Sequence, residues 1–365
     1  MAGIYIHIPF CRQACHYCNF HFSTSLRYKN ELVDALLKEI VLQKDYLADE
    51  KVETIYFGGG TPSLLNIEDV RLLMEKLKST FTVTPGDEIT LEANPDDITE
   101  EKLKEWKANG ITRLSIGVQS FFEEDLRWMN RAHNAEQAMN SLLLAKEFFA
   151  DITMDLIYGT PQLTNEKWKQ NVETAISLDI PHLSCYALTV EPKTPLDKMI
   201  QQHKTENVDP DKQSEQFLLL MQWMEAAGYE HYEISNFAKP GHRSRHNSSY
   251  WQGKKYLGLG PSAHSFNGKE RQWNVSNNSL YTASMNNELV PFEKEVLTAT
   301  QQMNEYIMTA LRTAEGIKLE KVYPGLLLKS KKYLESGLLK MENNSLLLTK
   351  EGKLLADGIA AALFA

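Results

Sequence analysis

Short apolar segments alternate with amphipathic segments over the first two-thirds of the chain. Six apolar segments rich in β-branched residues are predicted to be strands: Gly3–Ile8, Val52–Phe57, Glu88–Ala93, Arg113–Val118, Thr153–Ile157 and His182–Ala187. Five stretches between them have apolar residues at three- and four-residue spacing and are predicted to be helices: Arg27–Tyr46, Ile67–Thr80, Glu100–Asn109, Ala135–Phe149 and Glu166–Leu178. This alternation is typical of βα units, so the pattern predicts an α/β fold with a parallel sheet that curls into a partial (β/α)6 barrel.

Residues with chemical potential follow several of the predicted strands. Cys11 follows the first strand and a run of three glycines, ending at Gly60, follows the second. Asn94, Gln119 and Gly159 follow the third, fourth and fifth strands. Because the carboxyl ends of parallel strands lie on one side of a barrel, these loops are expected to form a single site.

The pattern changes in the last third of the chain. Tyr229–Ile234 is predicted to be one more strand, and regular structure is expected to lapse over Lys239–Gly260. Leu338–Met341 and Leu346–Thr349 are expected to form a hairpin, and Glu351–Leu363 a helix. These features predict a core domain over residues 1–235, a connecting region over 236–297 and a small winged-helix-like α+β domain over 298–365.

Composition and charge exclude several classes of protein. The chain has 365 residues, and its 39 basic and 48 acidic residues give a net charge of -9 without a long basic run. Nucleic acid is therefore not expected as a partner, because phosphate binding relies on clustered cations. No apolar run approaches the roughly 20 residues that span a bilayer, and the start of the sequence does not resemble a secretion signal. We expect a cytoplasmic protein without stable membrane insertion.

The cysteines point to metal chemistry. Three of the four, Cys11, Cys15 and Cys18, form a C-x3-C-x2-C loop, and Cys185 stands in an apolar stretch and is expected to be buried. A cluster of four irons that is fully held by protein takes four thiolates, so three would leave one iron open. An open iron can accept the amino and carboxylate groups of S-adenosylmethionine (SAM), whose cleavage by one electron yields an adenosyl radical.

A zinc site is the alternative reading of the same residues. Three cysteines and one histidine are a standard tetrahedral set for zinc, and His7, His16 and His21 lie near the loop in sequence. Structural zinc sites usually gather their ligands as two separated pairs, however, and the sequence contains no second cysteine pair. The cluster is therefore the favoured hypothesis.

The cysteine loop, with Tyr17 before its third cysteine, resembles the cluster-binding motif of the radical SAM superfamily. The segment Gly58-Gly59-Gly60-Thr61-Pro62 resembles the glycine-rich turn that contacts the methionine part of SAM in that superfamily. Glycine suits such a turn because only bare backbone can approach a ligand closely. The resemblance implies a TIM-like radical SAM barrel that carries a 4Fe-4S cluster and SAM.

Further segments narrow the resemblance to the branch of oxygen-independent coproporphyrinogen III dehydrogenases and their relatives. These segments are Leu91-Glu-Ala-Asn-Pro95, Ser115-Ile-Gly-Val-Gln-Ser120, Asn130-Arg-Ala-His133 and Asp155-Leu-Ile-Tyr-Gly159. Ten residues match SAM-contacting positions of that branch: Tyr5, Tyr17, Gly59, Gly60, Thr61, Glu92, Gln119, Arg131, Asp155 and Ala187. The resemblance thus implies that acidic side chains accept hydrogen bonds from SAM and that Arg131 pairs with a carboxylate.

Two activities compete within this branch. The dehydrogenases have a fourth cysteine two positions after the third, where this chain has Phe20. They also have a long segment before the first strand, whereas this sequence enters its first predicted strand at Gly3. Both departures argue against oxidative decarboxylation of coproporphyrinogen, and both match the heme chaperones of the HemW family. The dehydrogenase activity stays open as the alternative.

The chaperone resemblance implies a heme site. His246, Asn247 and Tyr250 form the His-Asn-x-x-Tyr pattern associated with heme in that family. A neutral imidazole is a sound axial ligand for heme iron, and Arg243 and Arg245 are positioned in sequence to neutralise propionates. The implied partners are heme, a heme-acceptor protein and a reductant protein.

Overall fold

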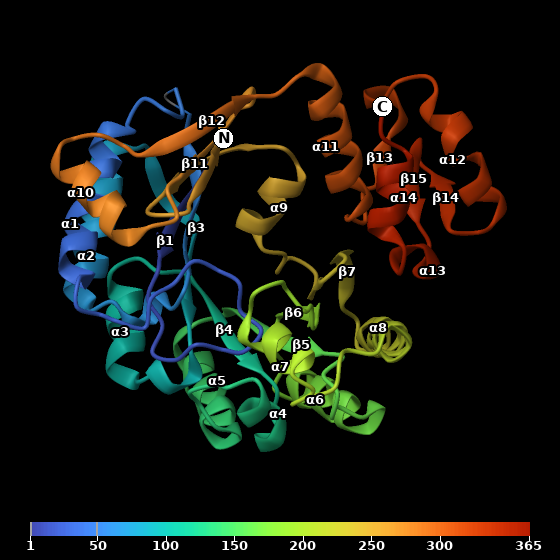
Figure 1. Cartoon of the computed structure of the whole chain (residues 1–365), viewed down its shortest axis with the longest axis horizontal. Helices are drawn as coiled ribbons and strands as arrows, with labels where there is room; N and C mark the ends of the chain where they lie inside the picture. The colour runs from blue at the N-terminus through green and yellow to red at the C-terminus, as the bar shows by residue number, and fades with distance from the viewer. Residues whose placement is uncertain (1, 49) are drawn as a thin grey trace.

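A 12-stranded sheet forms the centre of the protein, as a computed structural model of residues 2–48 and 50–365 shows (Figure 1). Six parallel strands lie side by side in chain order: β1 (Ala2–Ile8), β2 (Val52–Gly59), β3 (Val83–Ala93), β4 (Arg113–Gln119), β5 (Asp151–Tyr158) and β6 (His182–Ala187). Within the described residues, β1 and β6 do not pair with each other, and each carries further strands on its outer side. The sheet is therefore open, as expected for a partial barrel.

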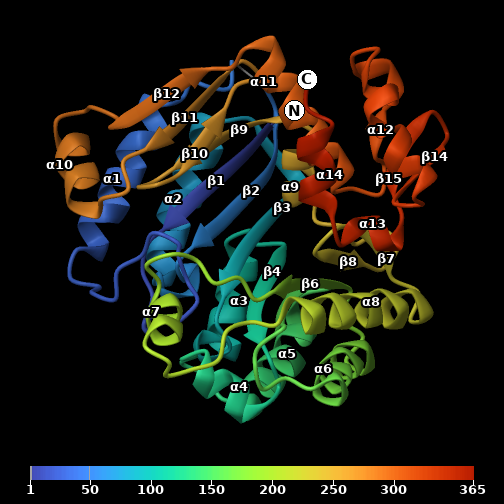
Figure 2. The same cartoon turned by 45° about the vertical axis from the view of Figure 1, so that its right-hand side comes forward.

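Amphipathic helices cover the outer face of this sheet (Figure 2). They are α1 (Lys29–Leu42), α2 (Ile67–Thr80), α3 (Glu100–Ala108), α5 (Ala135–Phe148) and α6 (Asn165–Ser177). Leu36, Leu73, Trp106 and Trp168 from these helices are fully buried against the strands. Burial of such side chains stabilises the fold by roughly 1.5–3 kcal/mol each, so the helical stripes predicted from the sequence are what hold the parallel strands together.

The six predicted strands are confirmed, and five agree with the structure to within two residues. The exception is β3, which begins five residues before the predicted start at Glu88. Its pairing with β2 shifts register, from Val52 opposite Val83 to Thr54 opposite Glu88. Turn-forming residues occupy this irregularity, including Gly86 with a φ of 91°, so the sequence pattern hid the first part of the strand.

The expected lapse of regular structure over Lys239–Gly260 is wrong. This segment contains helix α9 (Arg245–Trp251) and strand β9 (Lys255–Leu259), and β9 pairs in parallel with β1. Helix α9 has no apolar periodicity because its seven residues are mostly polar, and a distant carboxylate fixes its amino end. Glu88 accepts hydrogen bonds from the backbone N–H groups of Arg245 at 2.9 Å and His246 at 2.8 Å.

Further elements extend both edges of the sheet. The predicted strand Tyr229–Ile234 is present as β7 (Glu230–Glu233), which forms a hairpin with β8 (Asn236–Ala238) beside β6. Next to β9 lie β10 (His264–Phe266), β11 (Glu270–Asn274) and β12 (Phe292–Val296). Helices α4 (Glu123–Trp128), α7 (Pro195–Gln201), α8 (Pro210–Ala226) and α10 (Asn278–Asn286) complete this part.

The last segment forms a small α+β domain with its own apolar core, as expected. It comprises α11 (Ala299–Leu311), β13 (Ile317–Lys318), α12 (Leu326–Glu335), β14 (Leu339–Glu342), β15 (Ser345–Leu348), α13 (Lys350–Lys353) and α14 (Ala356–Ala362). The predicted hairpin is β14–β15, whose turn residues Asn343 and Asn344 both have positive φ. The predicted continuous helix Glu351–Leu363 is wrong, because a turn at Leu354 and Leu355 divides the segment into the two short helices α13 and α14.

No helix in the described part of the chain is long and apolar enough to cross a membrane. The predicted burial of Cys185 is confirmed, with 1% of its surface exposed in the middle of β6.

Candidate functional site

The cysteine loop leaves the carboxyl end of β1 and lies against the ends of β2 to β4. Cys11, Cys15 and Cys18 are half-buried free thiols. Thr61 donates a hydrogen bond to Cys11 Sγ at 3.5 Å, and Arg131 Nη1 donates to Cys15 Sγ at 3.3 Å. The structure therefore brings the three cysteines together with two of the residues predicted to bind SAM.

Three side chains outside the predicted site residues, those of Asn130, Asp97 and Asn278, hold this loop in place. Asn130 Nδ2 donates to the carbonyl of Ala14 at 2.7 Å, and its Oδ1 accepts from Gln13 Nε2 at 2.7 Å. Buried Asp97 accepts from Arg12 Nη2 at 2.7 Å and from Ser63 Oγ at 2.8 Å.

The third side chain that holds the loop is Asn278 at the start of α10, whose Oδ1 lies 2.7 Å from His21 Nε2. Asn130 has a sequence signal in the quoted Asn-Arg-Ala-His segment, whereas Asp97 and Asn278 have none that stands out from ordinary polar residues.

The glycine-rich turn lies under the cysteine loop. Gly59 has a φ of 107°, which a side chain rarely tolerates, and a Cβ on it would stand 2.6 Å from the His7 ring. A Cβ on Gly60 would stand 2.6 Å from the carbonyl oxygen of Phe10. The glycines are thus required for the two loops to approach each other. Close packing is thus a second reason for glycine at these positions, besides the predicted backbone contact with SAM.

Arg131 is a half-buried cation at the centre of the site. Besides Cys15, its Nη2 donates to Asn94 Oδ1 and to the carbonyl of Gly117, both at 2.8 Å. Burial alone would lower its pKa, but nearby Tyr17 and Cys15 raise it above the usual value. Its Nε is buried and has no hydrogen-bond partner among the described residues. Arg131 is therefore fixed, charged and has a donor left for a ligand.

Two half-buried carboxyl groups, those of Glu92 and Asp155, face the same interior. Burial raises the pKa of Glu92 and of Asp155 to about 7 in each case. Glu92 accepts a hydrogen bond from Tyr56 at 2.8 Å. Asp155 faces the same interior from strand β5. Groups that are costly to bury in the charged form become good acceptors once a ligand with ammonium or hydroxyl donors arrives.

The remaining predicted SAM contacts border the same interior. The hydroxyl of Tyr5 lies 3.2 Å from His7 Nδ1, and Arg131 Nη1 donates to the hydroxyl of Tyr17 at 3.5 Å. Gln119 is buried at the end of β4 with a φ of 69°. Ala187 is the last residue of β6 and is exposed at the rim. These roles toward SAM stay predictions.

The thiols suit an iron–sulfur cluster by their chemistry. Burial raises the pKa of Cys11, and it raises that of Cys18 to about 11, so metal coordination is what would keep them as thiolates. Three thiolates on one loop leave one iron of a cubane without a protein ligand. The donor set therefore fits the cluster.

The predicted heme residues lie at the opposite end of the strands. His246 is 1% exposed; its Nδ1 is 2.8 Å from Thr54 Oγ1 and its Nε2 is 2.9 Å from the hydroxyl of Tyr250. Burial lowers the pKa of His246 to about 3. Thr54 is near the start of β2 and Gly60 follows its end, so about 20 Å of extended chain separates His246 from the glycine-rich turn. Tyr56 bridges this span, because its ring lies 5.0 Å from that of His246 and 6.1 Å from that of Tyr5.

The other members of the predicted heme loop are largely occupied within the protein. The backbone N–H of Asn247 donates to Ser244, the residue that caps α9. Arg243 is paired with Glu230 at 2.9 Å and with Glu315 at 2.8 Å. Any heme propionate at Arg243 would have to compete with these two carboxylates.

Comparison with known proteins agrees with this geometry. Residues 5–175 match the radical SAM superfamily, and residues 297–355 match the HemN C-terminal domain. The chain is 34% identical to the heme chaperone HemW of Bacillus subtilis over 377 aligned positions, which cover 99% of both chains. The chain belongs to the HemW family. The heme chaperone HemW of Escherichia coli is another relative, 36% identical over 72% of this chain and 69% of its own.

A solved structure supports the fold of this HemW family member. Coproporphyrinogen III oxidase (HemN) from Escherichia coli, described as a radical SAM enzyme, superposes with a TM-score of 0.85. The alignment covers 100% of this chain and 90% of HemN, at 23% identity. At this identity the match establishes the shared barrel and C-terminal domain, and it does not transfer the HemN reaction.

Proposed function

We propose that this protein is a heme chaperone: it binds heme and transfers it to an acceptor protein, and it carries a 4Fe-4S cluster and SAM. The observation that carries this proposal is the full-length similarity to heme chaperone HemW. The residues agree with it. Cys11, Cys15 and Cys18 are three thiols beside a fixed arginine, and exposed Phe20 stands where the dehydrogenase branch has a fourth cysteine.

The chain's own residues have distinct roles at the cluster end of the barrel. A cluster with one iron free of protein ligands supplies a binding point for SAM and one electron for its sulfonium. Arg131 orients Cys15 and offers its Nε to a carboxylate. Glu92 and Asp155 accept hydrogen bonds from the amino and ribose groups of SAM. Their raised pKa values reflect the cost of burying their charged forms, and hydrogen bonds from SAM offset that cost.

Partners follow from this function. Transfer requires a heme-acceptor protein, and reduction of the cluster requires a reductant protein. An acidic surface with net charge -9 does not favour nucleic acid, and the cysteine content favours the reducing cytoplasm.

Titration of the anaerobically reconstituted protein with hemin tests the proposal. We expect one heme per chain, followed at its absorbance maximum, and weaker binding in His246→Ala. An assay with coproporphyrinogen, SAM and a reductant is expected to yield no protoporphyrinogen. Absence of stoichiometric heme binding, or formation of protoporphyrinogen at a catalytic rate, would overturn the proposal in favour of the dehydrogenase.

A further inference from the structure

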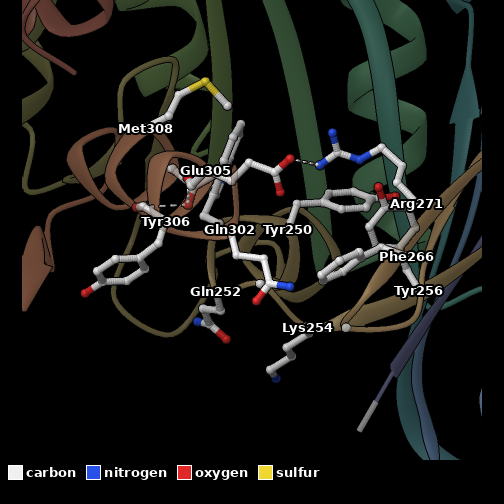
Figure 3. Close-up of a pocket in the computed structure, with 14 residues that line it drawn as sticks. Tyr250, Gln252, Lys254, Tyr256, Phe266, Arg271, Gln302, Glu305, Tyr306 and Met308 are labelled. Atoms are coloured by element: carbon white, nitrogen blue, oxygen red, sulfur yellow. Dashed lines mark hydrogen bonds and ion pairs between the residues drawn. The ribbon is translucent and has the colours of Figure 1, made fainter. Parts of the chain in front are cut away.

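A cleft separates α9 from α11, the first helix of the C-terminal domain. Two cavities of about 270 and 280 Å³ lie along it, and both are lined by Trp251, Gln252 and Tyr306. Because they share these walls, they are two halves of one cleft, and together they fall within the roughly 300–1,000 Å³ typical of cofactor pockets. Figure 3 shows the half that is bounded by strands β9, β10 and β11.

The walls of the cleft are aromatic, with the Tyr250 and Tyr256 rings perpendicular to each other. The rings of Tyr250 and Tyr256 are 4.7 Å apart, and Phe266 follows Tyr256 at 6.4 Å. Tyr306 projects from α11 on the other side (Figure 3). Trp251 lies between the two halves, and its buried indole N–H has no hydrogen-bond partner within the described residues. Such walls offer ring edges and faces to an aromatic ligand, and the indole N–H suits a ligand that brings a hydrogen-bond acceptor.

The cations of the cleft differ in how they are used. Arg271 is tied to Glu305 at 2.8 Å, as the dashed line in Figure 3 marks. Lys318 and Lys321 line the far half, where Lys321 Nζ lies 5.6 Å from the Tyr306 ring centre. In the part of the chain that the structure describes, neither lysine forms an ion pair. Two unpaired cations at one end of an aromatic slot favour a ligand with two carboxylates at one edge.

Tyr250 connects the cleft to the barrel interior. Its ring lines the cleft, while its hydroxyl is bound to buried His246. A ligand that enters between α9 and α11 therefore meets Tyr250 before it reaches His246.

We propose that heme docks in this cleft, with its porphyrin face against the aromatic walls and its two propionates at Lys318 and Lys321. The inference rests on the proposed heme-binding function and adds the place and orientation of binding. It assigns the C-terminal domain a direct role, because α11 supplies one wall and the segment 318–321, at the end of β13 and just after it, supplies both cations.

A bulky residue inside the cleft tests the location. Thr309→Trp places an indole in the cavity, whereas Thr300→Trp makes the same change at an exposed position of the same helix. We expect the hemin dissociation constant to rise at least about tenfold in Thr309→Trp and to stay unchanged in Thr300→Trp. Equal iron and sulfide content and equal thermal midpoints show that both variants are folded.

The chemistry of the ligand tests the orientation. In Lys318→Ala/Lys321→Ala, hemin is expected to bind about fivefold to tenfold more weakly, because two charge-assisted contacts are lost. Heme dimethyl ester, which has no free carboxylates, should bind the parent and this variant equally.

The outcomes separate the two proposals. If the parent binds no hemin, the proposed function fails. If the parent binds hemin and folded Thr309→Trp binds it equally well, or if the double lysine variant loses hemin and the ester to the same extent, the cleft proposal is overturned while the proposed function stands.

Discussion

Arg131 illustrates how one residue defines the candidate SAM site. Its guanidinium contacts Cys15, Tyr17, Asn94 and Gly117, and so it joins the cysteine loop to the ends of β3 and β4. A half-buried charge that is held by neutral oxygens and a thiol has spare capacity for an anion. This is the property expected of a residue that pairs with the carboxylate of SAM.

Arg131→Met is expected to weaken SAM binding about tenfold or more, because charged hydrogen bonds contribute about 1.5–3 kcal/mol each. Anaerobic isothermal titration with SAM measures this change. Arg127→Met is the matched control, since Arg127 is exposed and pairs with Glu123 on the surface of α4. Equal affinity of the parent and Arg131→Met would contradict the assigned role.

The burial of His246 could not be predicted from the sequence. The His-Asn-x-x-Tyr pattern identifies a candidate ligand, but it does not reveal that Thr54 and Tyr250 occupy both ring nitrogens. That arrangement depends on Glu88, a residue 158 positions away, which fixes the start of α9. Local pattern therefore found the residue, and tertiary contacts decided its state.

A pH effect follows from this burial. The pKa of His246 in the folded state, about 3, is below the usual 6.5, so the unfolded chain takes up the proton first. The contribution of neutral His246 to the free energy of unfolding is therefore fully present above pH 6.5 and is lost as the pH falls. Urea denaturation between pH 6.5 and pH 5 should show a decline that is shallower in His246→Gln by up to about 1.4 kcal/mol per pH unit. Parallel curves for the two proteins would contradict this assignment.

At the scale of elements, the sequence predicted what periodicity controls. The six strands and the amphipathic helices were found because each buries one face or both. Helix α9 and strand β9 were missed because a polar helix of seven residues and a strand with two nearby glycines carry no periodic signal. Their positions come from pairing with β1 and from capping by Glu88.

The carboxyl group of Glu39 connects helix α1 with the end of β9, with β11 and with α10. Fully buried Glu39 accepts hydrogen bonds from Tyr281 at 2.6 Å, Asn274 at 2.6 Å and the backbone N–H of Gly260 at 2.7 Å. All three partners are donors. A neutral amide in this place would therefore leave its own N–H groups facing donors.

Glu39→Gln is expected to lower the free energy of unfolding by about 1–3 kcal/mol, the usual result of leaving buried polar groups unsatisfied. Urea denaturation at neutral pH measures the change. Glu31→Gln, at an exposed position in the first turn of the same helix, should change it by less than about 0.5 kcal/mol. A Glu39→Gln midpoint equal to that of the parent would rule out this account of the junction.

At the scale of the whole molecule, the C-terminal domain is tied to the barrel by polar contacts. Arg312 of the domain pairs with buried Glu233 at 2.9 Å, and its guanidinium lies 5.2 Å from the ring of Trp251 in α9. The backbone N–H of Ile234 also donates to the carbonyl of Arg312 at 3.0 Å. The sequence predicted both domains, but contacts between polar residues so far apart leave no periodic trace.

Arg312→Ala removes the partner of Glu233 and should lower the free energy of unfolding by roughly 1–3 kcal/mol, a range reduced because Arg312 is a quarter exposed. Tryptophan fluorescence during urea denaturation follows the change. Arg71→Ala removes two exposed ion pairs on α2 and is expected to have little effect. Equal destabilisation by both substitutions would show that the domain junction has no special role.

The central claim is that Cys11, Cys15 and Cys18 hold a cluster whose open iron binds SAM. Electron paramagnetic resonance of the reduced, anaerobically reconstituted protein, recorded with and without SAM, tests it most directly. The account predicts about four irons and four sulfides per chain, a cluster signal that changes when SAM is added, loss of that response in Cys15→Ser, and retention in Cys185→Ser. A parent protein that lacks iron and sulfide, or a signal that SAM leaves unchanged, would contradict the account.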